Sequence, residues 1–390
     1  MKNKLSIITF ISLIIGIIFG LFFSEHTDSI SFIGTFYIDF LKYMIVPIVF
    51  TSVTVSIYDS RKLKNKLVLK SVVLFVLMFV ITFVISSLII TIINPSKGFV
   101  FETVDWQGAT TDILLQSVIA NLIPKDFKRF LTGAYLFFVI VMSFVVGYVS
   151  SLSKSGQSFI ETIRKIKDYL FTILEYFMYF TPFAVFSLMA STVSKYGSIF
   201  LGVGFRYIIT AYICALIALI LIMIVPVLVI RKMSPLTYLH KISKIWLMTI
   251  TTCSSSATLP YTIKTCKEEF EIPEKITDVV VPLGCTIHMC GGAVSFALLG
   301  LFCSKLFGVE ITFVRYMMML AYAVLINMAA PGIPNGGVVV GATYLQLLGI
   351  PLDFIGFYSG IYKLLDMVYT TLNVTGDITA DVIIDSIENK

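Results

Sequence analysis

Six long apolar runs occupy most of the first 230 residues of this chain. They cover residues 5–23, 33–58, 68–93, 132–152, 168–192 and 199–230. About 20 apolar residues in a helix suffice to cross the hydrocarbon core of a bilayer. Charged residues make up only 13% of the 390 positions, whereas a soluble domain carries about 25%. The sequence therefore predicts an all-α integral membrane protein.

Basic residues mark one side of the membrane. Lys2 and Lys4 precede the first run, and further lysines and arginines follow the second, fourth and sixth runs. Because basic loops stay in the cytoplasm, this alternation predicts a multi-pass protein of the plasma or inner cell membrane with both termini cytoplasmic. A cluster of Lys125, Lys128 and Arg129 falls on the opposite side and is the exception.

Two later segments are apolar but are interrupted at their centres. Residues 236–269 carry a cluster of hydroxyl side chains and Pro260, and residues 311–350 carry Pro331, Pro334 and neighbouring glycines. Such interruptions leave backbone groups unpaired at membrane depth, which is tolerated only where protein or water covers them. We expect two re-entrant hairpins, which are the best sequence indication of a transporter's binding site. Two kinked ordinary helices are the alternative.

The last apolar segment carries two acids and an amide. Asp366, Asn373 and Asp377 are spaced by 7 and 4 residues, so they share one face of a helix. A charge that faced lipid would cost several kcal/mol. We therefore expect these side chains to bind an ammonium group, a cation or both, as in a transporter. No phosphate loop, dinucleotide motif or nucleophile elbow indicates an enzyme, and no nucleic acid partner is expected.

Three motifs of this chain resemble the signatures of one transporter family. They are Ser254–Pro260, Pro331–Pro334 and Asp366–Asp377. On these motifs the chain resembles the dicarboxylate/amino acid:cation symporter family, which includes glutamate and neutral amino acid carriers, from residue 5 to about residue 385. The resemblance implies eight transmembrane helices plus two re-entrant hairpins, inverted repeats and a homotrimer. It also implies an elevator mechanism, in which a transport domain moves against a static scaffold.

The same resemblance divides the chain into two parts. Scaffold and trimerisation helices are expected mainly in residues 1–67 and 113–198, and two transport-domain helices in residues 68–93 and 199–230. The transport-domain core is expected in residues 233–390, with hairpin 236–269, helix 275–306, hairpin 311–350 and helix 352–385. The binding residues that the family implies all fall in this core.

The resemblance also implies roles for the polar side chains. Asp366 would receive the α-ammonium of an amino acid substrate and Asn373 its α-carboxylate, with further donors from the first hairpin. The full set of expected substrate contacts is Ser254, Ser255, Ile333, Gly337, Asp366, Tyr369, Thr370 and Asn373. For the two serines, ordinary capping inside a packed helix is the alternative.

Two departures from the family pattern bear on the substrate. Tyr369 stands where carriers of acidic amino acids have an arginine, which would pair with a side-chain carboxylate. Gly292 stands where the family has a threonine, which enlarges the space. We therefore expect a neutral α-amino acid, with a bulky or aromatic side chain that stacks on Tyr369. The alternative is a tyrosine that only fills the vacated volume.

The cation sites depart further from the family. Where the family reads Asn-Met-Asp-Gly-Thr, this chain reads His288 to Gly292, so Cys290 replaces a sodium-ligating aspartate. We expect that site to be lost, because a thiol suits sodium poorly. The ligands expected at the surviving sites are Gly284, Thr286, His288, Met289, Asn327, Met328, Ala330, Asn373 and Asp377. No cofactor other than the coupling ion is expected.

His288 leaves the identity of the coupling ion open. An intramembrane histidine can carry a proton, because imidazole changes charge near physiological pH, or it can be a neutral core residue. The favoured interpretation is import of a neutral amino acid with sodium at reduced stoichiometry. The alternatives are a proton-coupled symporter or exchanger of the same fold, and a substrate-gated ion pore.

Overall fold

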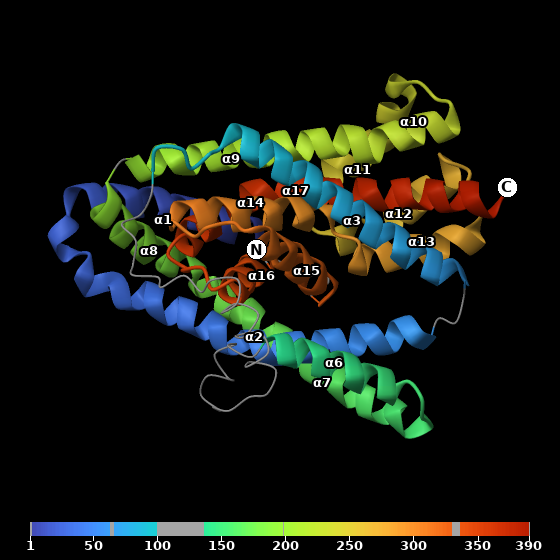
Figure 1. Cartoon of the computed structure of the whole chain (residues 1–390), viewed down its shortest axis with the longest axis horizontal. Helices are drawn as coiled ribbons and strands as arrows, with labels where there is room; N and C mark the ends of the chain where they lie inside the picture. Colours follow the sequence, from blue (N-terminus) through green and yellow to red (C-terminus); the bar gives the residue numbers. More distant parts are fainter. Residues whose placement is uncertain (1, 63–65, 100–135, 198, 330–335, 390) are drawn as a thin grey trace.

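The computed structural model describes residues 2–62, 66–99, 136–197, 199–329 and 336–389, which are helical nearly throughout and contain no strand. The helices, drawn in Figure 1, are α1 (Lys2–Phe22), α2 (Asp28–Lys62), α3 (Lys66–Ile93), α6 (Leu136–Ser150), α7 (Lys154–Phe177), α8 (Thr181–Tyr196), α9 (Ile199–Ala218), α10 (Val225–Arg231), α11 (Pro235–Thr252), α12 (Ser255–Glu268), α13 (Glu274–Ile287), α14 (Cys290–Leu306), α15 (Phe313–Ala329), α16 (Gly336–Leu347) and α17 (Ile355–Glu388). The prediction of an all-helical architecture is confirmed for the described residues.

Four helical segments of the described chain are long and apolar enough to cross a membrane. They are Asp28–Asp59, Lys66–Ile93, Leu201–Arg231 and Glu274–Leu306. On α3, Leu69, Val73 and Leu77 are each more than half exposed and recur every fourth residue, so they form an apolar stripe on the helix surface. An exposed apolar stripe of this kind suits lipid rather than water.

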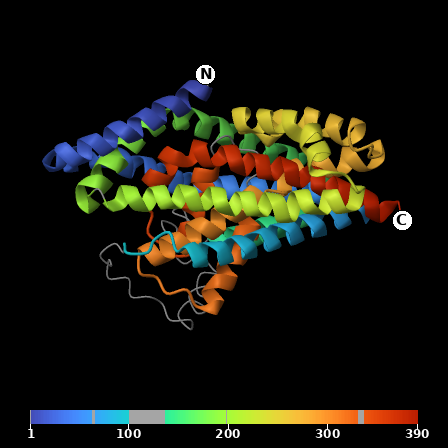
Figure 2. The same cartoon turned by 90° about the horizontal axis from the view of Figure 1, so that it is seen from above.

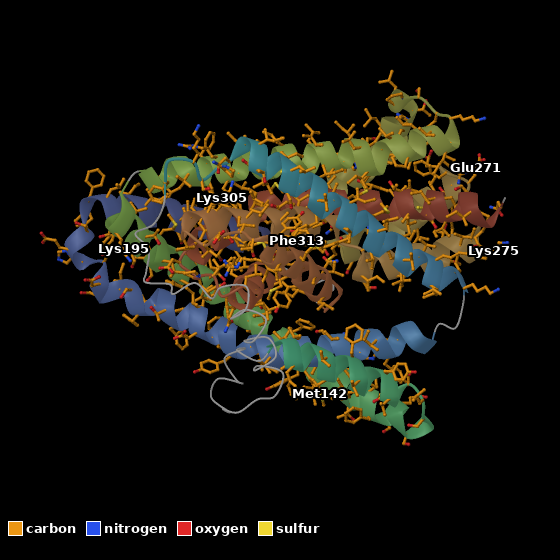
Figure 3. The ribbon with its side chains drawn as sticks, viewed as in Figure 1. Met142, Lys195, Glu271, Lys275, Lys305 and Phe313 are labelled. Carbon is orange, nitrogen blue, oxygen red and sulfur yellow. The ribbon has the colours of Figure 1, made fainter. Side chains whose placement is uncertain are left out.

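Charged side chains mark the two ends of the molecule. Figure 2 shows α17 extending along the long axis, with the C-terminus at one end. In Figure 3, Glu271 and Lys275 lie near that end, whereas Lys195 lies toward the other. Lys305 lies between these two groups along the long axis.

The apolar run over residues 168–192 is not a single helix. α7 ends at Phe177 and α8 begins at Thr181, with Pro182 in its first turn and a short 3-10 turn between the two helices. Proline favours the first turn of a helix, because the amide proton that it lacks has no partner there. The sequence motif Thr181-Pro182 is thus the local reason why a new helix begins here.

Helices α11 and α12 form a helical hairpin over the first interrupted segment. They meet at Cys253, whose φ of 48° lies in the left-handed region and reverses the chain. Serine side chains begin both helices, because Ser234 and Ser254 accept hydrogen bonds from the amides of the first turn. Helices α15 and α16 cover the second interrupted segment, and its tip at residues 330–335 lies outside the described residues.

The helix expected over residues 275–306 is broken in the structure. α13 ends at Ile287 and α14 begins at Cys290, while His288 and Met289 between them have ψ angles of 94° and 75°. The prediction of one continuous helix is therefore wrong. The break turns the side chain of His288 toward α17, and the contact formed there replaces regular helix geometry.

Candidate functional site

Helix α17 carries the polar residues expected to form the site. It packs against α13, α14 and the α11–α12 hairpin (Figure 1). Asp366, Thr370, Asn373 and Asp377 follow one another along it. Asp377 is 2% exposed, whereas Asp366 and Asn373 are half-buried. One end of this polar stripe is therefore accessible to a ligand, and the other end is enclosed by protein.

Polar contacts fix the first hairpin to α17. The hydroxyls of Thr249 and Thr371 are 2.8 Å apart, and the indole of Trp246 donates a 2.9 Å hydrogen bond to α17. These contacts hold Cys253 at the hairpin tip close enough to Asp366 for the two side chains to interact electrostatically. Helix α12 begins at the same tip, and the unpaired amide groups of a helix N-terminus suit a carboxylate.

The serines of the tip differ in their hydrogen bonds. The hydroxyl of Ser254 accepts a 3.3 Å hydrogen bond from the amide of Ala257, so it caps α12. The capping alternative therefore describes this hydroxyl. Ser255 is half-buried and is the first residue of α12. Its backbone amide is one of those that remain available at the helix start.

Asp366 lies among several hydrogen-bond donors. Thr370 donates to its Oδ1 at 3.1 Å, and Tyr362 donates from the preceding turn of α17. Tyr362 also packs against Gly337 of α16, where a Cβ would collide with the phenol hydroxyl. The structure thus brings Asp366, Thr370 and Gly337 together, with Tyr362 as the link between Asp366 and α16.

Lys363 is a cation that the sequence interpretation missed. It is half-buried, it lies one helical turn before Asp366, and its ammonium group hydrogen-bonds the thiol of Cys253 at the hairpin tip. Residues three apart are neighbours on a helix surface. The spacing of Lys363 and Asp366 is therefore the sequence signal that would have identified it.

The two positions that depart from the family pattern both lie in tightly packed surroundings. Tyr369 is 3% exposed and faces Tyr212 and Tyr358. This burial favours the alternative in which the tyrosine fills volume. A Cβ on Gly292 would lie 2.6 Å from Oδ1 of Asn327, so the asparagine occupies the space that the missing side chain leaves.

A buried cluster lies at the break between α13 and α14. Nδ1 of His288 is 3.0 Å from Oδ1 of Asp377, and its Nε2 is 3.0 Å from Sγ of Cys290. The ring of Phe75 from α3 stacks on the imidazole with the centroids 4.9 Å apart. Because His288 is 1% exposed and its partner is a carboxylate, a protonated imidazole would neutralise the buried acid.

Two glycines allow the helices to approach this cluster closely. A Cβ on Gly284 would lie 2.5 Å from Oδ1 of Asp377, and a Cβ on Gly376 would lie 2.4 Å from Cε1 of His288. Neither position has room for a side chain. The glycines therefore help to set the geometry of the pair.

Gly376→Ala should lower the thermal stability of the protein, because the added methyl group overpacks the cluster at a cost of about 1–3 kcal/mol. The measurement is the Tm of the purified protein in detergent, which should fall by several degrees. Gly202→Ala is the matched control, because a Cβ at that helical glycine meets nothing within 4 Å. An equal Tm for both variants would contradict the packing described for Gly376.

Only some of the other expected cation ligands lie close to the buried cluster. Oδ1 of Asn373 accepts a 2.7 Å hydrogen bond from the amide of Gly291, and Asn327 donates to the last carbonyl of α13 at 3.2 Å. Met289 is half-buried at the helix break, whereas Thr286 is exposed and does not join the buried cluster. The described part of the chain leaves out Ala330, Ile333 and the side chain of Met328.

Comparison with known proteins adds an independent finding. The model of the sodium:dicarboxylate symporter family matches residues 5–387. The proton/sodium-glutamate symport protein of Geobacillus stearothermophilus is 27% identical over 98% of this chain and 94% of its own length. The proton/glutamate-aspartate symporter of Bacillus subtilis (strain 168) is 22% identical over 100% and 96% of the two chains. Excitatory amino acid transporter 3 of Mus musculus is 24% identical over 73% of this chain and 56% of its own length.

Proposed function

Because this chain belongs to the sodium:dicarboxylate symporter family, we propose that it is a secondary active transporter that imports an amino acid by symport with a cation. The observation that carries the proposal is the place of Asp366. This half-buried acid lies beside the hairpin tip, where it would neutralise an α-ammonium group. The N-terminus of α12 at the same tip would accept the α-carboxylate.

The proposed substrate is a neutral α-amino acid. An acidic side chain would bring a second negative charge into a low-dielectric site, and Tyr369 in the packed core supplies no positive charge to offset it. Two observations favour a second candidate, an acidic amino acid. The ammonium group of Lys363 lies near Asp366, and the relatives include proteins named for glutamate and aspartate.

Lys363→Met separates the two candidate substrates. For a neutral substrate, binding of alanine or serine should change by less than about threefold, which is under 1 kcal/mol. For an acidic substrate, glutamate binding should weaken by about tenfold or more, because a buried charge would lose its partner. Binding is measured by the ligand-dependent rise in Tm, since a ligand of the folded state stabilises it. Glutamate binding that requires Lys363, with Lys363→Arg restoring it, would contradict a neutral substrate.

The contact between His288 and Asp377 favours a proton over sodium as the coupling ion. The imidazole of His288 lies against the Asp377 carboxylate. The thiol of Cys290 and the ring of Phe75 also contact this imidazole. Sodium prefers oxygen ligands, which these groups do not offer. The Bacillus subtilis relative is named for the proton as its coupling ion, and the Geobacillus stearothermophilus relative is named for both the proton and sodium. We therefore favour the proton-coupled interpretation over sodium at reduced stoichiometry.

The proposal extends to an elevator mechanism in a homotrimer. Residues 68–93, 199–230 and 233–390 would move against a scaffold formed by residues 1–67 and 113–198. The protein would lie in the plasma or inner cell membrane with both termini in the cytoplasm, as the basic loops indicate. Crosslinking of the purified protein in detergent should then yield a trimer.

Counterflow in proteoliposomes tests the proposed function. Vesicles preloaded with an unlabelled neutral amino acid should take up the labelled amino acid without any ion gradient, because a carrier exchanges substrate across the membrane. Vesicles that lack the protein but are preloaded in the same way are the control. A steady current without substrate flux would instead indicate an ion pore and would contradict symport.

A further inference from the structure

A third carboxylate lies on α17 beyond the site described above. Asp381 follows Asp377 by one helical turn and is completely shielded from solvent. Its Oδ2 accepts a 2.7 Å hydrogen bond from the hydroxyl of Thr277 in α13, and the thiol of Cys266 in α12 lies beside the same carboxylate. Its Oδ1 has no hydrogen-bond partner among the described residues.

No cation of the described chain is paired with this acid. The arginine on the neighbouring α10, Arg231, is bound instead to Asp385, with 2.7 Å between Nη2 and Oδ2. The titratable and charged groups that face Asp381 or its thiol neighbour are Arg231, Tyr238, Cys266, Asp377 and Asp385. An ionised carboxylate buried without a paired cation is costly, so this position favours an acid that takes up a proton.

The place of Asp381 along α17 connects the buried cluster with the surface. On one side is Asp377, about 6 Å away along the helix axis for a spacing of four residues. On the other side is the Asp385–Arg231 pair, whose arginine side chain is 25% exposed. Helix α10, whose last residue is Arg231, lies near the end of the molecule that carries the C-terminus (Figure 1). Asp381 thus lies between an enclosed acid and a group in contact with water.

We propose that Asp381 is a proton-relay residue of transport, which carries the coupling proton between the interior of the protein and water at the C-terminal end of α17. A proton that arrives from the substrate side binds Oδ1 and converts the carboxylate to a neutral acid. Its release toward Asp385 and water restores the carboxylate, so one proton enters and one leaves. The inference rests on the proton-coupled function proposed above.

A purely structural role makes a different prediction. A neutral Asp381 would tie α12 and α13 to α17 through Cys266 and Thr277, and an asparagine has the size and the hydrogen-bonding groups to do the same. An asparagine never releases a proton. The Asp381→Asn variant therefore separates a relay from an anchor.

The experiment compares two activities of the same proteoliposomes. With acid outside and no sodium, wild-type vesicles accumulate the labelled amino acid, and Asp381→Asn vesicles should accumulate at least tenfold less. Counterflow, which needs no net proton transfer, should stay within twofold of the wild type. Asp381→Glu, which keeps the acid, should restore accumulation. Glu388→Gln is the matched control, because it makes the same acid-to-amide change at the exposed end of α17 and should leave both activities unchanged.

Each other outcome overturns the relay. Accumulation by Asp381→Asn at the wild-type level would refute it while leaving proton coupling intact. If both the Asn and the Glu variant lost counterflow as well as accumulation, Asp381 would have a packing role instead. Wild-type accumulation that ignores the pH gradient would remove the proposed function itself, and the relay with it.

Discussion

Replacing Asp366 with asparagine should weaken amino acid binding by about 100-fold, because removing one partner of a buried charge pair costs about 2–5 kcal/mol. The effect should be large here, because the α-ammonium group would lose the carboxylate that lies beside the hairpin tip. Thr370 and Tyr362, which donate to this carboxylate, cannot replace it, because both are neutral.

Ligand-induced stabilisation of the purified protein measures this loss over a range of substrate concentrations. Asp353→Asn is the control, because it removes an exposed acid just before α17. The Tm of the substrate-free Asp366→Asn variant should stay at or above the wild-type value, which shows that the fold is intact. Equal affinities for the variant and the wild type would remove Asp366 from the substrate site.

Replacing His288 with glutamine should reduce accumulation driven by a pH gradient by at least about tenfold, because coupling requires a group that gains and loses a proton. Glutamine keeps a donor that can reach Asp377, so the buried acid retains a hydrogen bond. Counterflow should therefore persist, although accumulation is lost. The combination of the two results distinguishes a defect in coupling from a failure to fold.

The matched control for this variant is His240→Gln, because His240 is exposed on α11 and lies apart from the buried cluster. It should leave both activities at the wild-type level. Full accumulation by His288→Gln along the pH gradient would show that the imidazole is not the coupling group, and Asp377 would then carry that role alone.

The parts of the fold that local sequence determines could be predicted. The hairpin α11–α12 lies where the hydroxyl-rich interruption predicted it, because serines at the starts of both helices cap their first turns. Asp366, Asn373 and Asp377 share one helix, because the apolar spacing around them is helical throughout. These features depend on residues that are close together in the sequence.

The parts that tertiary contacts determine could not be predicted. The break between α13 and α14 is stabilised by the contact of His288 with Asp377, which are far apart in the sequence. Tyr369 is buried beside Tyr212 of α9, and this contact between distant parts of the sequence was not predicted either. The spacing of Lys363 from Asp366 is visible in the sequence. It was missed because the sequence interpretation considered only the acids and the amide of this helix and not the basic residue three positions before Asp366.

The most direct test of cation-coupled amino acid symport is the uptake of a labelled neutral amino acid by proteoliposomes with acid outside and no sodium present. The internal concentration should rise above the external one and should fall back to it when a protonophore abolishes the pH difference. Accumulation that follows only a sodium gradient would contradict the proton as the driving ion. Equilibration without accumulation under either gradient would contradict symport.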